Sequence, residues 1–85
     1  MIGQQEITQE FLEFCSNVWG AVNAADEKHG TWQGDKLVDC FNRVEAELEE
    51  VYDAIRKGEI DGQHGIKAEA VQVAACAYKM IRRVS

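Results

Sequence analysis

Apolar side chains recur at alternating steps of four and three residues along the middle of the chain. They are Leu37, Phe41, Val44, Leu48, Val51 and Ile55. This spacing keeps every one of them on one face of an α-helix, as in the seam of a coiled coil. Asp35 suits the N-cap, and Arg56-Lys57-Gly58 combines basic residues with a glycine, which is typical of a helix C-terminus. We therefore predict a helix that is capped by Asp35 and ends at Gly58.

A similar pattern precedes this helix. Steps of three or four residues connect Ile7, Phe11, Phe14, Val18, Val22 and Ala25. Leu12, Cys15 and Trp19 widen the stripe, as in a helix that packs on two partners. The segment Lys28-His29-Gly30 provides a stop. We predict a first helix from about Gln5 to this stop, followed by a short loop over residues 30–34.

A third helix is predicted from about Ile66 to Val84, after a glycine-rich loop over residues 58–65. Its apolar stripe consists of Ile66, Ala70, Val73, Ala77, Met80 or Ile81, and Val84. Alanines make the middle of this helix slender, so a neighbouring helix can come close. The chain contains no proline to interrupt any of the three helices.

These patterns predict an all-α fold with a single domain over residues 1–85 and three main helices in an antiparallel arrangement. A chain of 85 residues buries only roughly 60–65% of the surface that it exposes when unfolded. Its own core is therefore expected to be thin. Three wide apolar stripes do not easily cover one another in one small chain, so we expect a homodimer or homotetramer that completes a helical bundle.

Composition narrows the classes of partner. The net charge is −6 and the nine basic residues are spread out, so we expect no polymeric nucleic acid partner. Cys15, Cys40 and Cys76 lie far apart in apolar surroundings, which indicates buried thiols in a reducing compartment. No segment approaches the roughly 20 apolar residues of a membrane span, and the first residues lack the pattern of a signal peptide. We therefore expect a cytoplasmic protein without a membrane partner.

Two pairs of oxygen-bearing side chains stand at helical spacing on either side of the loop over residues 58–65. Glu47 and Glu50 are three residues apart on the second predicted helix, and Glu69 and Gln72 are three apart on the third. Each pair flanks an apolar stripe, whereas Glu45 points further out. Burying carboxylates is costly unless a cation or hydrogen bonds compensate. If the two faces meet, they supply the oxygen ligands that Mg²⁺ needs; a solvated acidic face is the alternative.

The same residues resemble a known family, the MazG-like all-α nucleoside triphosphate pyrophosphatases. That family carries EExxE, a spacer and ExxD on two antiparallel helices. Residues 46–50, AELEE, match the first motif and residues 69–72, EAVQ, match the second. The run EAVQVAACAYKMI and the upstream KHGTW are also similar to segments of small members. The resemblance covers roughly residues 24–82.

The resemblance implies a Mg²⁺-dependent hydrolysis of (deoxy)nucleoside triphosphates to the monophosphate and pyrophosphate. Glu47, Glu50 and Glu69 would be the catalytic and metal-binding residues, and Gln72 a further ligand or a group that orients water. Mn²⁺ is an alternative metal. The chain departs from the family at Ala46 and Gln72, where acidic residues are usual. The change to Gln weakens metal affinity, shifts the substrate, or marks a chain that binds without hydrolysing.

Two further residues are candidates for binding the substrate. Lys79 lies two turns beyond Gln72 on the same face and could contact a phosphate; the alternative is a solvated surface lysine. Trp32 could stack on a nucleobase, or it could cover one end of the core. Arg43 is interpreted as an ion-pair partner of Glu47, one turn away. His64 has no partner at the spacing that zinc requires.

Two functions thus stay open on the sequence. The first is a nucleotide pyrophosphohydrolase that controls or cleans the nucleotide pool. The second is a non-catalytic helical module of the same fold, which binds a nucleotide or another protein.

Overall fold

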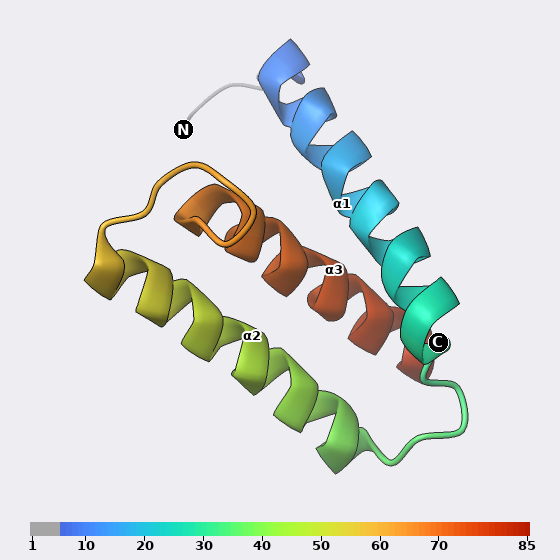
Figure 1. Cartoon of the computed structure of the whole chain (residues 1–85). Helices are drawn as coiled ribbons and strands as arrows, with labels where there is room; N and C mark the ends of the chain where they lie inside the picture. Colours follow the sequence, from blue (N-terminus) through green and yellow to red (C-terminus); the bar gives the residue numbers. More distant parts are fainter. Residues whose placement is uncertain (1–5) are drawn as a thin grey trace, which may run out of the picture.

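The structure, a computed structural model, describes residues 6–85 and is all-helical over that range. It contains α1 (Gln9–His29), α2 (Leu37–Lys57) and α3 (Ile66–Val84), with no strand among the described residues (Figure 1). The all-α prediction is confirmed, and α3 has the predicted bounds. The predicted start of the first helix at Gln5 lies outside the described residues.

Helix α3 is the central element. It packs against α1 and against α2, whereas α1 and α2 make no helix-to-helix contact within the described residues. Figure 1 shows α1 crossing α3 near the C-terminal ends of both helices, so that the first half of α1 projects away from the other two. Residues from the second half of α1, from α2 and from α3 line a cleft in this region.

The helix ends follow local rules, with two corrections. Thr8 caps α1, because its hydroxyl accepts a hydrogen bond of 3.1 Å from the Phe11 N–H. The predicted cap of α2 is wrong: Lys36 occupies the N-cap position and no side chain caps the helix. Asp35 instead accepts a hydrogen bond of 2.6 Å from the Arg43 side chain, eight residues further along the chain. Its carboxylate therefore binds Arg43 and does not cap α2. Gly58 ends α2 as predicted, with a left-handed φ of 72°.

The predicted stripe of α2 is not the face that packs on α3. Cys40 and Ala54 are buried there, while Leu37, Phe41, Leu48 and Ile55 are 48%, 54%, 52% and 56% exposed. Small side chains let the two helices approach closely, so the large ones are left to one side. The same shift occurs in α3, where Ala77 and Val84 are exposed and Glu69, Ala75 and Lys79 are buried.

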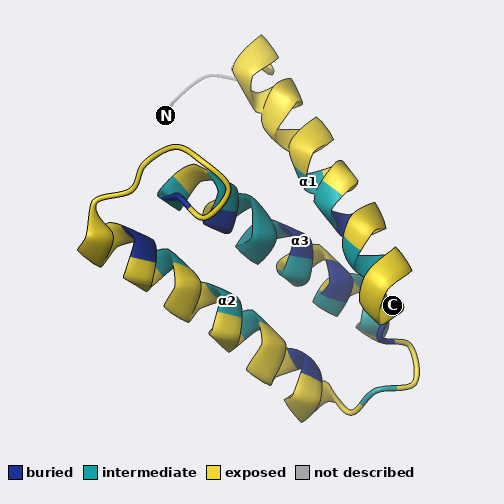
Figure 2. Cartoon of the chain, in the orientation of Figure 1, coloured by how far each residue is buried: buried dark blue, intermediate teal, exposed yellow. Residues whose placement is uncertain are grey.

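The core is as thin as the chain length predicts. Its buried apolar side chains among the described residues are Val22, Trp32, Cys40, Ala54 and Ala75. Figure 2 shows that the buried segments, in dark blue, lie mainly on the sides where the helices face one another, while the outer sides are exposed. Within residues 6–85, none of the helices combines the length and the apolar character that crossing a bilayer requires.

Candidate functional site

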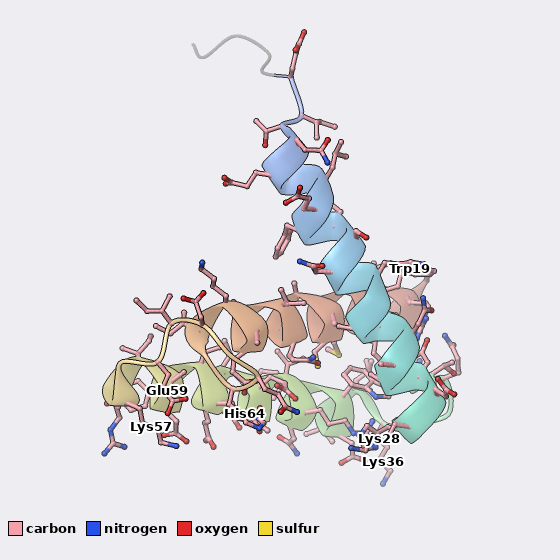
Figure 3. The ribbon with its side chains drawn as sticks, turned by 45° about the horizontal axis from the view of Figure 1, so that its top comes forward. Trp19, Lys28, Lys36, Lys57, Glu59 and His64 are labelled. Carbon is pink, nitrogen blue, oxygen red and sulfur yellow. The ribbon has the colours of Figure 1, made fainter. Side chains whose placement is uncertain are left out.

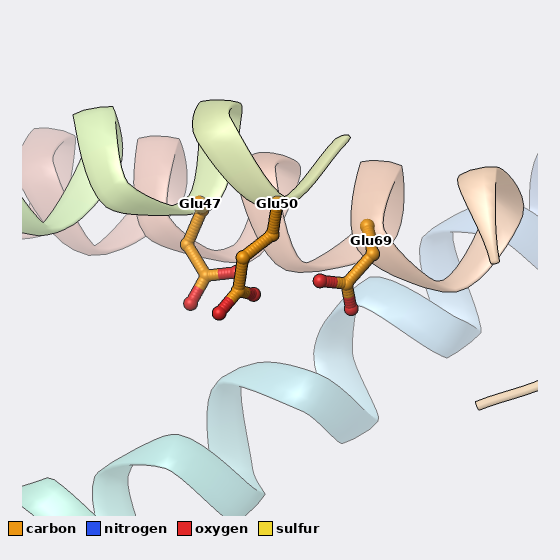
Figure 4. Close-up of side chains that lie close together, drawn as sticks. All are labelled: Glu47, Glu50 and Glu69. Atoms are coloured by element: carbon orange, nitrogen blue, oxygen red, sulfur yellow. The ribbon is translucent and has the colours of Figure 1, made fainter. Parts of the chain in front are cut away.

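Three carboxylates converge where α2 and α3 meet. Glu47 and Glu50 stand one turn apart on α2, and Glu69 stands in the first turn of α3. One carboxylate oxygen of each lies within 4.8 Å of the others. Figure 4 shows the three side chains pointing to the same side of the α2–α3 pair. The predicted meeting of the two acidic faces therefore occurs for these three residues, which we call the carboxylate trio.

Burial within the trio is uneven. Glu69 is 6% exposed, Glu47 is half-buried and Glu50 is exposed. The Glu47 Oε2 atom is buried and has no hydrogen-bond partner among the described residues. An unpaired buried acceptor costs about 1–3 kcal/mol. A cation at the trio would remove that cost, because carboxylate oxygens are ligands that Mg²⁺ and Ca²⁺ prefer.

The electrostatics of the trio favour a bound proton or cation. Burial, followed by the hydrogen bond and the charge of Glu50, raises the pKa of Glu47 to about 7. Burial and Glu50 also raise the pKa of Glu69. The electrostatic interaction with His64 lowers the pKa of Glu69 and so partly opposes this effect. Three carboxylates this close do not all ionise readily at neutral pH unless positive charge is added.

A cleft of about 560 Å³ begins beside the trio, between the second half of α1, α2 and α3. Glu47 and Gln72 line it, so Glu47 belongs both to the trio and to the cleft. Ala46 and Cys76 form part of its wall. Burial raises the pKa of the Cys76 thiol to about 11, which leaves the thiol protonated and unreactive at neutral pH.

The opposite end of the cleft is lined by Trp32 and by cationic side chains. Trp32 is buried and adopts a left-handed φ of 71°. Lys79 Nζ lies 4.7 Å and Arg43 Cζ lies 5.3 Å from the centre of a Trp32 ring. The indole therefore covers one end of the core, as one of its two sequence interpretations requires, and it also lines the cleft.

Lys79 is a structural ion-pair residue within this wall. Its side chain is 1% exposed, so its interpretation as a solvated surface lysine is wrong. Nζ donates a hydrogen bond of 2.9 Å to the Gly30 carbonyl and lies 3.0 Å from Asp26 Oδ1. Arg82 also holds Asp26 through hydrogen bonds of 2.8 and 2.9 Å, and lowers the pKa of Asp26 to about 2. These bonds tie α3 to the end of α1 and to the following loop.

Sequence reasoning missed several residues of the site. Lys28 and His29 line the cleft from the last turn of α1, and Figure 3 shows Lys28 at the end of α1 that leads toward the start of α2. Their basic character was interpreted only as a helix stop. Arg43 pairs with Asp35 rather than with Glu47, so the predicted one-turn ion pair is wrong. His64, labelled in Figure 3, shares a small hollow with Glu50 and Glu69.

No known protein family, curated protein or solved structure matches the chain. The resemblance to MazG-like enzymes therefore stays a prediction from the two motifs. The carboxylate trio and the cleft beside it are the features that point to a function.

Proposed function

We propose that the chain binds a divalent cation, Mg²⁺ or Mn²⁺, and hydrolyses (deoxy)nucleoside triphosphates to the monophosphate and pyrophosphate. The observation that carries this proposal is the carboxylate trio, in which a buried oxygen of Glu47 lacks a partner beside a cleft. Mg²⁺ is usually bound by one or a few carboxylates together with substrate phosphates and water. A site of this composition at the mouth of a cleft fits that use.

The cleft suits a nucleotide in size and in charge. Its volume of about 560 Å³ falls in the range of roughly 300–1,000 Å³ that is typical of small-molecule sites. The trio would hold the cation, which supplies positive charge for the phosphates when it is bound. Lys28 adds positive charge along the wall, whereas the charge of Arg43 is paired with Asp35. Trp32, which is 6% exposed, lines the same wall and would contact a base through the part of its ring that faces the cleft.

One of the three glutamates would act as the general base, and Glu47 is the candidate because its buried oxygen has no hydrogen-bond partner within residues 6–85. A carboxylate that is positioned on a water molecule can accept its proton. That water would attack the α-phosphorus, and pyrophosphate would leave. Glu50 and Glu69 would complete the metal ligands, with Gln72 as a fourth ligand or as the group that orients the water. Lys79 would contribute through its place in the wall, because Asp26 already neutralises its charge.

We also propose that the helices are antiparallel and that a second copy completes a helical bundle, as a homodimer or homotetramer in the cytoplasm. The thin core and the many half-exposed apolar side chains support self-association. The order of the two acidic motifs, which resembles that of the MazG-like family, supports the nucleotide substrate.

The alternative is a helical module that binds a nucleotide or a protein without hydrolysis. One observation favours it: Gln72, which lines the cleft, carries no negative charge and cannot act as a base. Under this alternative the trio binds the cation and the cleft holds a ligand, but no bond is broken.

Release of pyrophosphate from a panel of nucleoside triphosphates tests the proposal directly. We expect release that requires Mg²⁺ and is lost in Glu69→Gln, with Glu49→Gln as the control, because Glu49 is an exposed glutamate of α2 outside the trio. A rise in melting temperature with Mg²⁺ but no turnover would establish the alternative. If Mg²⁺ produces neither turnover nor a rise in melting temperature, both the proposal and its alternative are overturned.

A further inference from the structure

The α2–α3 pair carries an uncharged face on the side away from the carboxylate trio. On α2 it consists of Leu37, Phe41, Val44, Leu48, Val51, Tyr52 and Ile55. On α3 it consists of Ile66, Ala70, Val73, Ala77, Met80, Ile81 and Val84. At 100° per residue, these are all the residues within one 100°-wide strip of each helix. We call the two strips together the apolar face.

Burial places the two strips next to each other. Val44 and Val51 on α2, and Val73 and Met80 on α3, are half-buried and border the contact between the helices. The remaining members lie further from the contact. The cleft and the trio use the opposite flank of the same contact, because Glu47 and Gln72 line the cleft there. The two strips therefore form one surface across both helices.

Much of this surface is open to solvent. Phe41, Leu48 and Ile55 are more than half exposed on α2, and Ile81 and Val84 are 64% and 62% exposed on α3. Both helices are about 30 Å long, from 1.5 Å per residue, and the apolar character continues along each of them. Scattered apolar residues are normal on a surface, but a contiguous area of this extent marks an interaction site.

The exposed area of the chain indicates how much surface a partner would cover. The structure exposes 6514 Å², whereas a folded monomer of 9.5 kDa exposes about 5,000 Å². The excess is about 1,500 Å². Subtracting about 800 Å² for residues 1–5, the upper limit at ~160 Å² per residue, leaves about 700 Å². A stable interface of standard size covers about 800 Å² on each partner. The excess is of this order, and the exposed apolar side chains of α1 contribute to it together with the apolar face.

The shape and the charge of the face favour a second copy of this chain. The α2 strip carries large side chains, such as Phe41 and Leu48, and the α3 strip has small side chains at Ala70 and Ala77 between larger ones. Because a two-fold axis repeats each contact, it would let large side chains of each α2 lie over the small side chains of the partner's α3. The chain has a net charge of −6, but the face itself has no charged residue, so two copies can meet there without bringing like charges together.

We propose that the apolar face is a two-fold interface between two copies of this chain, and that it leaves the trio and the cleft on the outer sides of the dimer. The proposal assigns the self-association of the chain to this one surface. The interface does not depend on a bound cation or on hydrolysis, because it lies on the flank of the α2–α3 pair opposite the trio.

A matched pair of substitutions tests the assignment. Ile55 lies on the apolar face and Ile60 lies in the loop between α2 and α3, and each is 56% exposed. Ile55→Glu would bury an unpaired charge twice in a two-fold dimer, and we expect it to raise the dimer dissociation constant by at least ~100-fold. Ile60→Glu should leave the constant within about twofold. Leu48→Glu, which is nearer the middle of α2, should act as Ile55→Glu does.

Light scattering at micromolar concentration measures the mass, and the melting temperature is recorded at rising protein concentration. We expect twice the 9.5 kDa of one chain and a melting temperature that rises with concentration, as linkage requires for a dimer. The temperature series uses only the unaltered chain, so it stands even if a variant fails to fold. A monomeric mass, a melting temperature that is independent of concentration, or a dimer that persists in both Ile55→Glu and Leu48→Glu would overturn the proposal. The dimer can fail in this way while pyrophosphate release is retained, so the two proposals are tested separately.

Discussion

Replacing Glu47 by glutamine should stabilise the metal-free protein while abolishing its response to Mg²⁺. The folded protein holds the Glu47 proton up to a pKa of about 7, against an ordinary value of 4.5. Its stability should therefore fall as the pH rises from about 4.5 to 7, because the folded state has to release this proton at a cost. A difference of this size corresponds to roughly 3 kcal/mol, which the solvent around exposed Glu50 should reduce to about 2 kcal/mol.

The Glu47→Gln side chain cannot ionise and can donate a hydrogen bond to Glu50, so the variant avoids this cost. For a chain of 85 residues, about 2 kcal/mol corresponds to a rise in melting temperature of roughly 10 °C at pH 8. Thermal unfolding at pH 5 and pH 8, with and without Mg²⁺, measures both effects. Glu49→Gln removes the same charge from an exposed position of the same helix and is the control. Equal melting temperatures of the two variants at pH 8 would refute the reasoning.

Three further outcomes follow from the contacts of the site. Gln72→Asp adds a carboxylate beside Glu47, so it should tighten Mg²⁺ binding by calorimetric titration; an unchanged affinity would place Gln72 outside the metal shell. Lys79→Met should destabilise the fold by about 2–3 kcal/mol, less than a fully orphaned buried charge costs, because Arg82 still holds Asp26. Lys67→Met, whose ion pair with Asp61 is exposed, should cost under about 1 kcal/mol in the same denaturant titration. The pKa of Asp26 is lowered to about 2, so the ionised Asp26 carboxylate should add to the free energy of unfolding above pH 4. This added stability should be lost as the pH falls toward 2. An acid-unfolding curve of the unaltered chain, compared with that of Asp26→Asn, measures the loss.

The helices were predictable from the sequence because their signals are local. Periodic apolar residues define α3 from Ile66 to Val84, and Gly58 stops α2 where the sequence indicates. The meeting of Glu47, Glu50 and Glu69 was also predictable, since residues three apart share a helix face and a short loop joins the two helices. The cap of α2 was mispredicted because Asp35 has a competing partner in Arg43.

The wall of the cleft was not predictable, because it depends on contacts between distant parts of the chain. Lys79 binds the Gly30 carbonyl, 49 residues away in sequence, and no pattern around Lys79 distinguishes it from a solvated lysine. The packing face of α2 was mispredicted for a related reason. Hydrophobic periodicity locates the apolar side of a helix, but the closest approach to α3 is decided by the small residues Cys40 and Ala54.

The site and the apolar face have similar effects on the stability of the same helix pair, from opposite flanks. On one flank of the α2–α3 contact, the trio crowds negative charge and leaves a buried oxygen of Glu47 unpaired. On the other flank, the apolar face leaves large side chains in water. A chain with so thin a core has few other contacts to offset both costs. A cation at the trio and a second copy on the apolar face would each remove one of them, so both proposed partners would stabilise the folded state by binding to it.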